Sequence, residues 1–440
     1  MTPPPDYGAP SAVLDLAPVS LPARGAWRPN WRRLVGTAGP GLLIAVGYID
    51  PGNWATDLGG GSRYGYALLS MVLIANVVAM VVQALCVRLA IATGKSLAEH
   101  CREAFPRPVV LTLWASAELA MVMTDLAELV GGAIALKLLF GVGLVPGVLL
   151  TSAVTFAVLL YGRDDWRWLR RLVGGLVLVV AASFAILLWL AEPVWSEVAK
   201  GLLPTVELVS DPAMLLLGIG IVGATVMPHN LYLHSGLLAP TGRRLTIAAA
   251  KRRAIGENVR DSNASLVLAL VLNGSILIAA GAAFHSRGMT EIVDLSQAYE
   301  LLNPVLGCQI AALLFAIGLL AAGQSSTITG TLAGQMVMEG FLQLRLAPGL
   351  RRLITRLAAL GPALAYFAWA GESDTSRLLI LSQVVLSLQL PFAMIPLLGF
   401  VGRRRVMGEF VLGRTAKLGA WALALLIVGL NVVLICDTLS

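Results

Sequence analysis

Two short stretches interrupt long apolar runs, and both carry residues that can bind a cation. The first is Asp50-Pro-Gly-Asn53, and the second is Met227-Pro-His-Asn230. Each reads x-Pro-x-Asn and follows an apolar half-helix that contains glycine. Proline removes a backbone donor and glycine adds backbone freedom, so both stretches favour a helix break. Within a membrane, such a break leaves carbonyl groups free and is tolerated only beside a cavity or a ligand.

The side chains at the two breaks form a mixed oxygen and sulfur donor set. Asp50 supplies an anionic oxygen, Asn53 a neutral oxygen and Met227 a thioether sulfur, and the carbonyls of Gly47 and Ala224 can add further oxygen. Oxygen alone suits Mg²⁺ or Ca²⁺, whereas sulfur favours softer metals, so this set fits Mn²⁺, Fe²⁺ or Cd²⁺. Two other interpretations stay open, namely core packing for Met227 and a helix N-cap for Asp50.

Three carboxylates lie in one further apolar segment. Glu118 and Asp125 are two helical turns apart, and Glu128 follows three residues later, so all three share a broad helix face. Ionisable groups at membrane depth are costly and mark ion or proton pathways. We therefore expect a proton route here, although structural pairing with buried arginine would also explain these residues.

Other polar residues in apolar segments could complete the site. We expect His229 to handle a proton or organise water, with metal ligation as the alternative, and we expect His234 to pack. Either Gln383 or Gln389 could complete a coordination shell. Arg356, at the entry of a later segment, either pairs with a carboxylate or anchors the membrane interface.

The composition indicates a polytopic membrane protein that positions these residues within the bilayer. The chain has 440 residues, of which 57% are hydrophobic and 13% charged, with a mean hydropathy of +0.81. Soluble domains carry about 25% charged residues, and a membrane span needs about 20 apolar residues. The eleven predicted spans are 34–60, 66–89, 109–135, 139–161, 170–191, 212–238, 264–285, 304–338, 353–371, 378–401 and 417–436.

The two breaks fall in the first and the sixth predicted spans. Five is an odd number, so the sixth span starts on the opposite side of the membrane from the first. Interrupted helices in corresponding positions of two inverted halves indicate a transporter with a binding site at the midplane. The predicted parts are a tail (1–33), two inverted five-helix repeats (34–191 and 212–401) and a final span (417–436).

The net charge of +7 reflects membrane topology rather than nucleic-acid binding. Most of the 32 Lys and Arg residues fall in alternate connections between spans, which the positive-inside rule explains if the N-terminus is cytoplasmic. The C-terminus is then predicted outside. The four cysteines are scattered and indicate neither a disulfide framework nor a zinc site. Two glycosylation patterns, at Asn263 and Asn273, are discounted because they fall on the cytoplasmic side or within the membrane.

Three motifs together resemble those of the Nramp family. They are Asp-Pro-Gly-Asn at 50–53, Met-Pro-His-Asn at 227–230 and Gly-Gln-Ser-Ser-Thr-Ile-Thr-Gly-Thr-Leu-Ala-Gly-Gln-Met-Val-Met-Glu-Gly-Phe at 323–341. The similarity runs from about Gly36 to the C-terminus. Any one motif alone would be a weak signal, whereas the three in register are specific.

The resemblance implies a LeuT-type fold and proton-coupled import of divalent transition metals. It implies metal ligands at Asp50, Asn53, Met227, the Ala224 carbonyl and Gly47, where the family often has alanine, with Gln383 joining in occluded states. It also implies a proton network at Asp125, Glu128, Glu118, His229 and Arg356. Relatives that carry Mg²⁺ or Al³⁺ differ at the aspartate or methionine motifs, so the retention of both favours Mn²⁺ and Fe²⁺.

These observations predict an all-α importer that works by alternating access. We expect metal and protons as substrates, no resident cofactor, no nucleic-acid partner, and a monomer in the lipid bilayer of a bacterial inner membrane. Two alternatives are a related transporter for a harder cation such as Mg²⁺ and a symporter of sodium with an organic substrate, against which the sulfur of Met227 argues. An enzyme is not expected, since the chain has no H-E-x-x-H motif.

Overall fold

In the computed structural model, all regular secondary structure in the described part of the chain is helical. The structure describes residues 40–161, 166–292, 294–344, 348–370 and 375–439, and no strand occurs in these ranges. The predicted tail (1–33) and the start of the first predicted span (34–39) lie outside the described residues.

The first half of the chain contains the first broken helix, which consists of α3 and α4, together with several longer helices. Its helices are α3 (Pro40–Gly47), α4 (Pro51–Tyr64), α5 (Leu69–Thr93), α6 (Leu97–Ala104), α7 (Arg107–Phe140), α8 (Leu144–Tyr161), α9 (Trp166–Ala191), α10 (Trp195–Gly201) and α11 (Glu207–Ser210).

The second half of the chain contains the second broken helix, which consists of α12 and α13. Its elements are α12 (Pro212–Thr225), α13 (Pro228–Arg244), α14 (Ala248–Ala283), the 3₁₀ turn η2 (His285–Arg287), α15 (Leu295–Leu306), α16 (Ala311–Leu342), α17 (Pro348–Ala370), α18 (Thr375–Val401), α19 (Arg404–Met407), η3 (Gly408–Phe410) and α20 (Arg414–Leu439).

Both predicted helix breaks are present, and proline sets their position. Pro51 is the first residue of α4 and Pro228 is the first residue of α13. Proline suits this place because the first helical residues have no intrahelical partner for their N–H groups. Asp50 and Met227 precede the two prolines with extended backbones, at ψ values of 166° and 121°.

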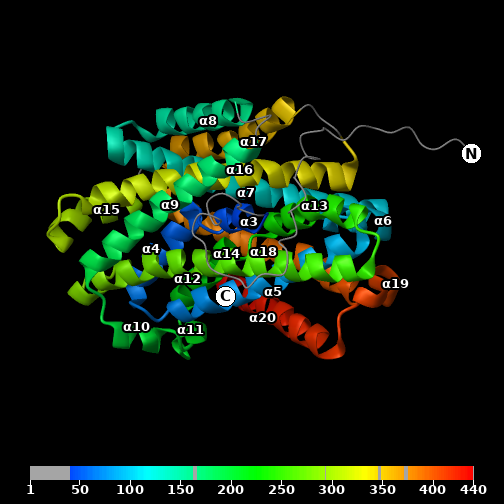
Figure 1. Cartoon of the computed structure of the whole chain (residues 1–440). Coiled ribbons are helices and arrows are strands. Elements are labelled where there is room, and N and C mark those ends of the chain that lie inside the picture. The colour runs from blue at the N-terminus through cyan, green and yellow to red at the C-terminus, as the bar shows by residue number, and fades with distance from the viewer. Residues whose placement is uncertain (1–39, 162–165, 293, 345–347, 371–374, 440) are drawn as a thin grey trace, which may run out of the picture.

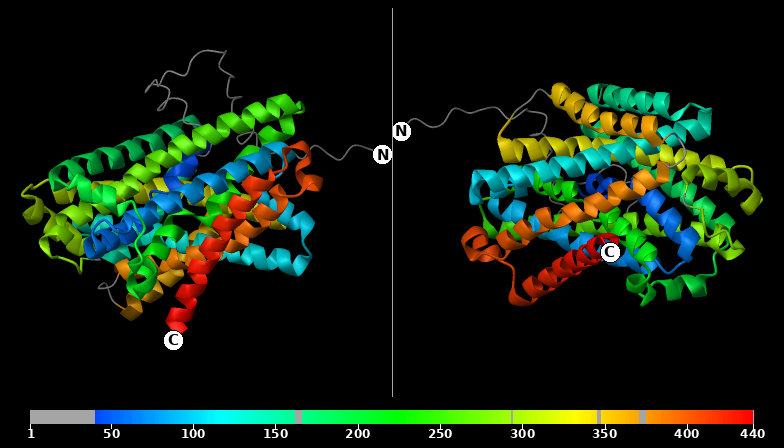
Figure 2. Two further views of the ribbon diagram at one scale, coloured as in Figure 1. Left: turned by 90° about the horizontal axis from the view of Figure 1, so that it is seen from below. Right: turned by 180° about the vertical axis from the view of Figure 1, so that it is seen from behind.

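The broken helices lie at the centre of the bundle. In Figures 1 and 2, α3, α4 and α12 are surrounded by longer helices, while α8, α17 and α20 lie at the edges. Small residues allow the close approach, as in many membrane helix contacts. A Cβ on Gly131 of α7 would come within 2.2 Å of Pro51, and one on Gly223 of α12 would come within 1.9 Å of the Gln383 carbonyl oxygen.

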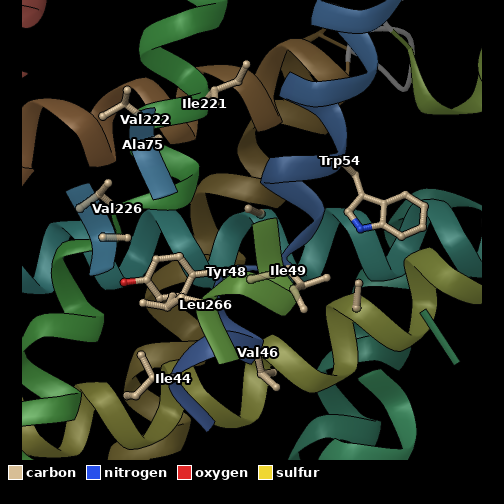
Figure 3. Close-up of a cluster of buried hydrophobic side chains, with 14 of the residues drawn as sticks. Ile44, Val46, Tyr48, Ile49, Trp54, Ala75, Ile221, Val222, Val226 and Leu266 are labelled. Atoms are coloured by element: carbon tan, nitrogen blue, oxygen red, sulfur yellow. The ribbon is translucent and has the colours of Figure 1, made fainter. Parts of the chain in front are cut away.

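Apolar side chains surround the first break on several sides. Figure 3 shows Tyr48 and Ile49 of the break among residues of α3, α5, α12 and α14. Trp54 of α4 contacts Phe184 of α9 and Phe315 of α16 edge to face, with ring centroids 4.6 Å and 5.1 Å apart. The polar groups of the break are therefore enclosed in a packed core.

The helices support a multi-pass membrane protein. Eight helices within the described residues are long and apolar enough to cross a membrane, when α12 and α13 are taken together. Two shorter apolar segments, Leu144–Ala157 and Leu357–Phe367, and the split pair α3–α4 correspond to the remaining predicted spans. Each predicted span thus coincides with helix, while the total of eleven crossings stays a prediction.

Some predicted boundaries differ from the structure. The span predicted at 264–285 belongs to α14, which begins at Ala248 and continues the helix through a polar, charged stretch. The span predicted from 304 joins two helices, since α15 ends at Leu306 and α16 begins at Ala311. Gly307 ends α15 with a left-handed backbone (φ 63°) that hydropathy alone does not reveal.

Candidate functional site

Asp50 caps a helix and also presents an oxygen that has no donor. Its Oδ1 accepts hydrogen bonds from the Asn53 backbone N–H (2.9 Å) and from Asn53 Nδ2 (2.8 Å). Its Oδ2 is buried and has no hydrogen-bond partner among the described residues. The N-cap interpretation is thus correct but incomplete. A buried carboxylate oxygen without a donor is costly, and a cation beside it would remove that cost.

Asn53 joins the two breaks directly. Its Nδ2 lies 3.1 Å from the Tyr48 carbonyl oxygen and 3.0 Å from the Ala224 carbonyl oxygen, to which it donates. The Ala224 carbonyl therefore faces the first break from the last turn of α12. Three of the predicted ligands, Asp50, Asn53 and Ala224, lie within one hydrogen-bonded group.

Met227 occupies the second break. It is fully buried and lies between Val226, which follows α12, and Pro228, which starts α13. It makes no side-chain capping bond to α13. Its position, three residues after the Ala224 carbonyl, is compatible with both core packing and a sulfur ligand.

Gly47 is the last residue of α3 and lies against Asn230 of α13. A Cβ at this position would come within 2.6 Å of Asn230 Nδ2, so glycine allows the close approach of α3 and α13. Both polar side-chain atoms of Asn230 are buried and have no hydrogen-bond partner in the described part of the chain. The sequence marks Asn230 only as a motif position, whereas in the structure its side chain faces Gly47.

The two glutamines of α18 have different surroundings. Gln383 lies over the first break, because a Cβ on Gly52 would come within 1.9 Å of Gln383 Nε2. Its Nε2 donates to Ser382 Oγ (2.9 Å), and its buried Oε1 has no partner among the described residues. Gln389 instead donates to Ser116 Oγ of α7 (3.2 Å). Gln383 is therefore the glutamine that can reach a bound ion.

Two of the three carboxylates of α7 lie together. Asp125 and Glu128 both face Gly330 of α16. A Cβ on Gly330 would come within 3.3 Å of Glu128 Oε1 and 3.6 Å of Asp125 Oδ1. Both carboxylates are buried. Glu118 lies about 10 Å farther along the helix, is partly exposed, and accepts a hydrogen bond from Trp114 Nε1 (3.1 Å).

His229 connects α13 with the acidic helix. Its ring is buried, and Nδ1 lies 3.3 Å from the hydroxyl of Thr124, the residue before Asp125. The structure thus brings His229, Asp125 and Glu128 into one region. Arg356 lies in α17, but its side chain is outside the described part of the structure.

A polar chain that the sequence did not suggest leads from the first break to α13. The sequence predicts only a packing role for His234, but its Nδ1 lies 2.8 Å from Gln83 Oε1. Gln83 Nε2 in turn donates to the Tyr48 hydroxyl (2.7 Å). Asn273 of α14 donates from Nδ2 to the Tyr48 carbonyl (2.9 Å) and lies 3.3 Å from Asn53 Oδ1. In the sequence, Gln83, His234 and Asn273 stand out only as polar residues within apolar segments.

The donor set differs from that of a resident metal centre. The described residues contain no group of three or more His, Cys, Asp or Glu side chains that could hold a metal ion. The atoms at the breaks are one carboxylate, amides, carbonyls and a thioether. Carboxylate-poor sites bind more weakly, which suits an ion that must be released. The fold, with its paired helix breaks, is that of a helical membrane transporter.

The chain belongs to the Nramp family. Residues 41–437 match the family model described as natural resistance-associated macrophage protein-like. A divalent metal cation transporter MntH of Agrobacterium fabrum is 50% identical over 408 residues, covering 93% of this chain and 88% of the relative. The MntH of Brucella suis is 52% identical over 408 residues, covering 93% and 89%.

Solved structures support the same assignment. A manganese transporter of Eremococcus coleocola, solved in complex with an aromatic bis-isothiourea substituted compound, superposes with a TM-score of 0.81 at 35% identity, over 94% of this chain and 89% of that one. Mhp1, a nucleobase-cation-symport-1 transporter, shares the fold alone, with a TM-score of 0.59 at 16% identity over 90% and 89% of the two chains. The predicted LeuT-type all-α fold is confirmed, as is the prediction of a transporter rather than an enzyme.

Proposed function

We propose that this chain imports divalent transition metal ions, chiefly Mn²⁺ and also Fe²⁺ and Cd²⁺, in symport with protons and by alternating access. Its relatives at about half identity are named divalent metal cation transporters, and a structural neighbour is named a manganese transporter. Metal and protons are substrates in this proposal, and no resident cofactor is involved. The protein acts as a monomer in the inner membrane of a bacterium.

The observation that carries the proposal is the buried Oδ2 of Asp50 at the first helix break, which has no hydrogen-bond partner among the described residues. Asn53 bonds to the other oxygen of Asp50 and to the Ala224 carbonyl. Gln383 lies over Gly52 with its amide oxygen unpartnered among the described residues, and Met227 forms the second break. A metal ion would lose water and take Asp50, Asn53, Ala224, Met227, Gly47 and Gln383 as ligands. The sulfur would favour Mn²⁺ over Ca²⁺ and Mg²⁺.

We assign proton movement to α7 and to His229 of the neighbouring helix α13. Asp125 and Glu128 are buried together, His229 contacts the neighbouring Thr124, and Glu118 lies farther along α7 toward the start of that helix. We assign Arg356 of α17 to the same proton path. Carboxylates change their proton affinity when a cation binds nearby. Metal at Asp50 would therefore favour release of a proton along α7, after which the central helices rock and open the opposite side.

The proposed orientation places the N-terminus in the cytoplasm and the C-terminus outside. Basic residues of several connections meet carbonyls and acids at one face, including Arg88 with the Phe410 carbonyl (2.8 Å), Arg243 with Glu99 (2.8 Å) and Arg252 with Glu409. This gathering of basic residues supports a cytoplasmic face. The matching breaks support inverted repeats at 34–191 and 212–401, with the span 417–436 added after them.

Uptake into proteoliposomes tests the proposal. The native chain should accumulate Mn²⁺ against excess external Mg²⁺ and Ca²⁺, and the lumen should acidify in step with Mn²⁺ entry. Liposomes that contain Asp50→Asn protein are the control. Absence of Mn²⁺ uptake would refute the import of Mn²⁺, and uptake of Mg²⁺ instead would favour the alternative of a transporter for harder cations. Mn²⁺ uptake without acidification would refute proton coupling but leave metal import standing.

A further inference from the structure

Asp57 is a buried carboxylate that the proposed transport cycle does not use. It lies on α4, two helical turns beyond Asp50, and none of its surface is exposed. Neither of its carboxylate oxygens has a hydrogen-bond partner among the described residues. A buried, unpartnered carboxylate is costly unless a cation or a proton accompanies it.

The neighbours of Asp57 along its helix face show what it packs against. Asn53 and Gly61 lie four residues before and after it, so all three share one face of α4. Asn53 Oδ1 lies 3.3 Å from Asn273 Nδ2 of α14, and a Cβ on Gly61 would come within 2.4 Å of the Leu277 carbonyl oxygen. Asp57 therefore lies in the contact between α4 and α14, at the level of Asn273 and Leu277.

Asn273 offers a second free oxygen in this contact. Its Nδ2 is used by the Tyr48 carbonyl and Asn53 Oδ1, while its Oδ1 is buried and has no partner in the described structure. Within that structure, Asp57 and Asn273 together present three oxygen acceptors without donors. No salt bridge within the described residues reaches Asp57, and Asp57 shares its helix face with the carboxylate of Asp50.

We propose that Asp57 and Asn273 form a second, outer cation site, which a divalent metal ion occupies before it reaches Asp50. This inference rests on the proposed transport of divalent metal. The proposed orientation puts the end of α4 at the outer face, so Asp57 lies between that face and Asp50. The outer site has only oxygen donors and attracts cations by charge, whereas the inner site adds the sulfur of Met227 and selects among them.

Metal binding to the purified full-length protein in detergent tests the site without transport. Asp50→Asn protein should retain weak Mn²⁺ binding, and the double variant Asp50→Asn/Asp57→Asn should bind Mn²⁺ about tenfold more weakly still. Asp50→Asn/Asp57→Glu is the matched control and should keep the residual binding. Equal Mn²⁺ binding by Asp50→Asn protein and by the Asp50→Asn/Asp57→Asn double variant would overturn the proposal.

A change of donor atom gives an independent test if Asp57→Asn protein does not fold. Thiolate favours Cd²⁺ over Mn²⁺, so Asp50→Asn/Asp57→Cys should bind Cd²⁺ in preference to Mn²⁺ more strongly than Asp50→Asn alone. The four native cysteines are common to both proteins. An unchanged preference would overturn the proposal.

Transport measurements separate a metal site from a structural role. Asp57→Asn should raise the KM for external Mn²⁺ about fivefold while the maximal rate and the KM for efflux from the opposite side stay near native values. Equal effects in both directions would make Asp57 structural and overturn the outer site. If native protein binds Mn²⁺ through Asp57 yet moves none, the proposed function fails and the outer site stands.

Discussion

The two helix breaks have the same backbone design but different side-chain chemistry. At the first break, Asp50 caps α4 through its side chain and Asn53 bonds to carbonyls on both sides. At the second, Met227 makes no capping bond, and Asn230 has no hydrogen-bond partner for its side chain in the part of the chain that the structure describes. The first break is held by hydrogen bonds of its own side chains, whereas the second is held by packing and by hydrogen bonds to residues of other helices, namely Asn53 and Thr124.

This difference suggests a division of labour. A hydrogen-bonded break fixes the position of a charged oxygen, and preorganised charge binds cations at little further cost. A break without internal side-chain hydrogen bonds can rearrange more easily and can present a soft ligand. We infer that the first break provides charge and geometry, and that the second provides selectivity and movement.

The largest expected effect comes from removing the charge of the first break. Asparagine caps helices as well as aspartate, so Asp50→Asn should fold normally but lose Mn²⁺ uptake by about 100-fold, since a cation would lose its charged partner. Uptake of radioactive Mn²⁺ by proteoliposomes measures this loss. Asp211→Asn, at the cap of α12, is the matched control and should transport normally. Near-native uptake by Asp50→Asn would remove Asp50 from the site.

The second prediction concerns the close contact between α12 and α18. Gly223→Ala would place a Cβ 1.9 Å from the Gln383 carbonyl oxygen, which is backbone and cannot swing away. We expect a loss of about 1–3 kcal/mol of stability and reduced uptake. Thermal unfolding in detergent measures the change. Gly256→Ala, which has open space around it, should have little effect, and equal stability of the two variants would contradict the contact.

Selectivity should change at the second break. Met227→Ala should retain Mn²⁺ uptake but become about tenfold more sensitive to competition by Ca²⁺ and Mg²⁺, because the remaining ligands are oxygen. Competition curves for Mn²⁺ uptake give the measurement. Met214→Ala, a buried methionine near the start of α12, controls for lost packing. If both variants keep native selectivity, the Met227 sulfur does not set the selectivity.

The smallest expected effects concern the carboxylates of α7. Asp125→Asn should reduce acidification of the lumen more than it reduces Mn²⁺ binding, because Asp125 lies on α7 near Glu128, next to the threonine that contacts His229, and is not among the proposed metal ligands. Glu118→Gln should have a weaker effect, since Glu118 already accepts a bond from Trp114. Lumenal pH and Mn²⁺ binding are measured on the same preparations. Parallel loss of both quantities in Asp125→Asn would indicate a structural role.

Local rules in the sequence determined much of this protein. Pro51 and Pro228 fix where the helices break, because proline is favoured at the first helical position and disrupts helix interiors. The placement of Asp50 and Met227 directly before them follows from the chain itself. Apolar run lengths predicted the spans, although Gly307 and the polar start of α14 moved two boundaries.

Only the tertiary structure decided which polar residues meet. Gln383 and Gln389 are six residues apart, about 120° around α18, and periodicity alone does not show which of them faces the breaks. The neighbouring helices place Gln383 over Gly52 and Gln389 on Ser116. The partners of Asn273 and the enclosure of Asp57 likewise depend on how α4 packs against α14. Sequence spacing gives the face of a helix, whereas the helix that covers that face is set by long-range packing.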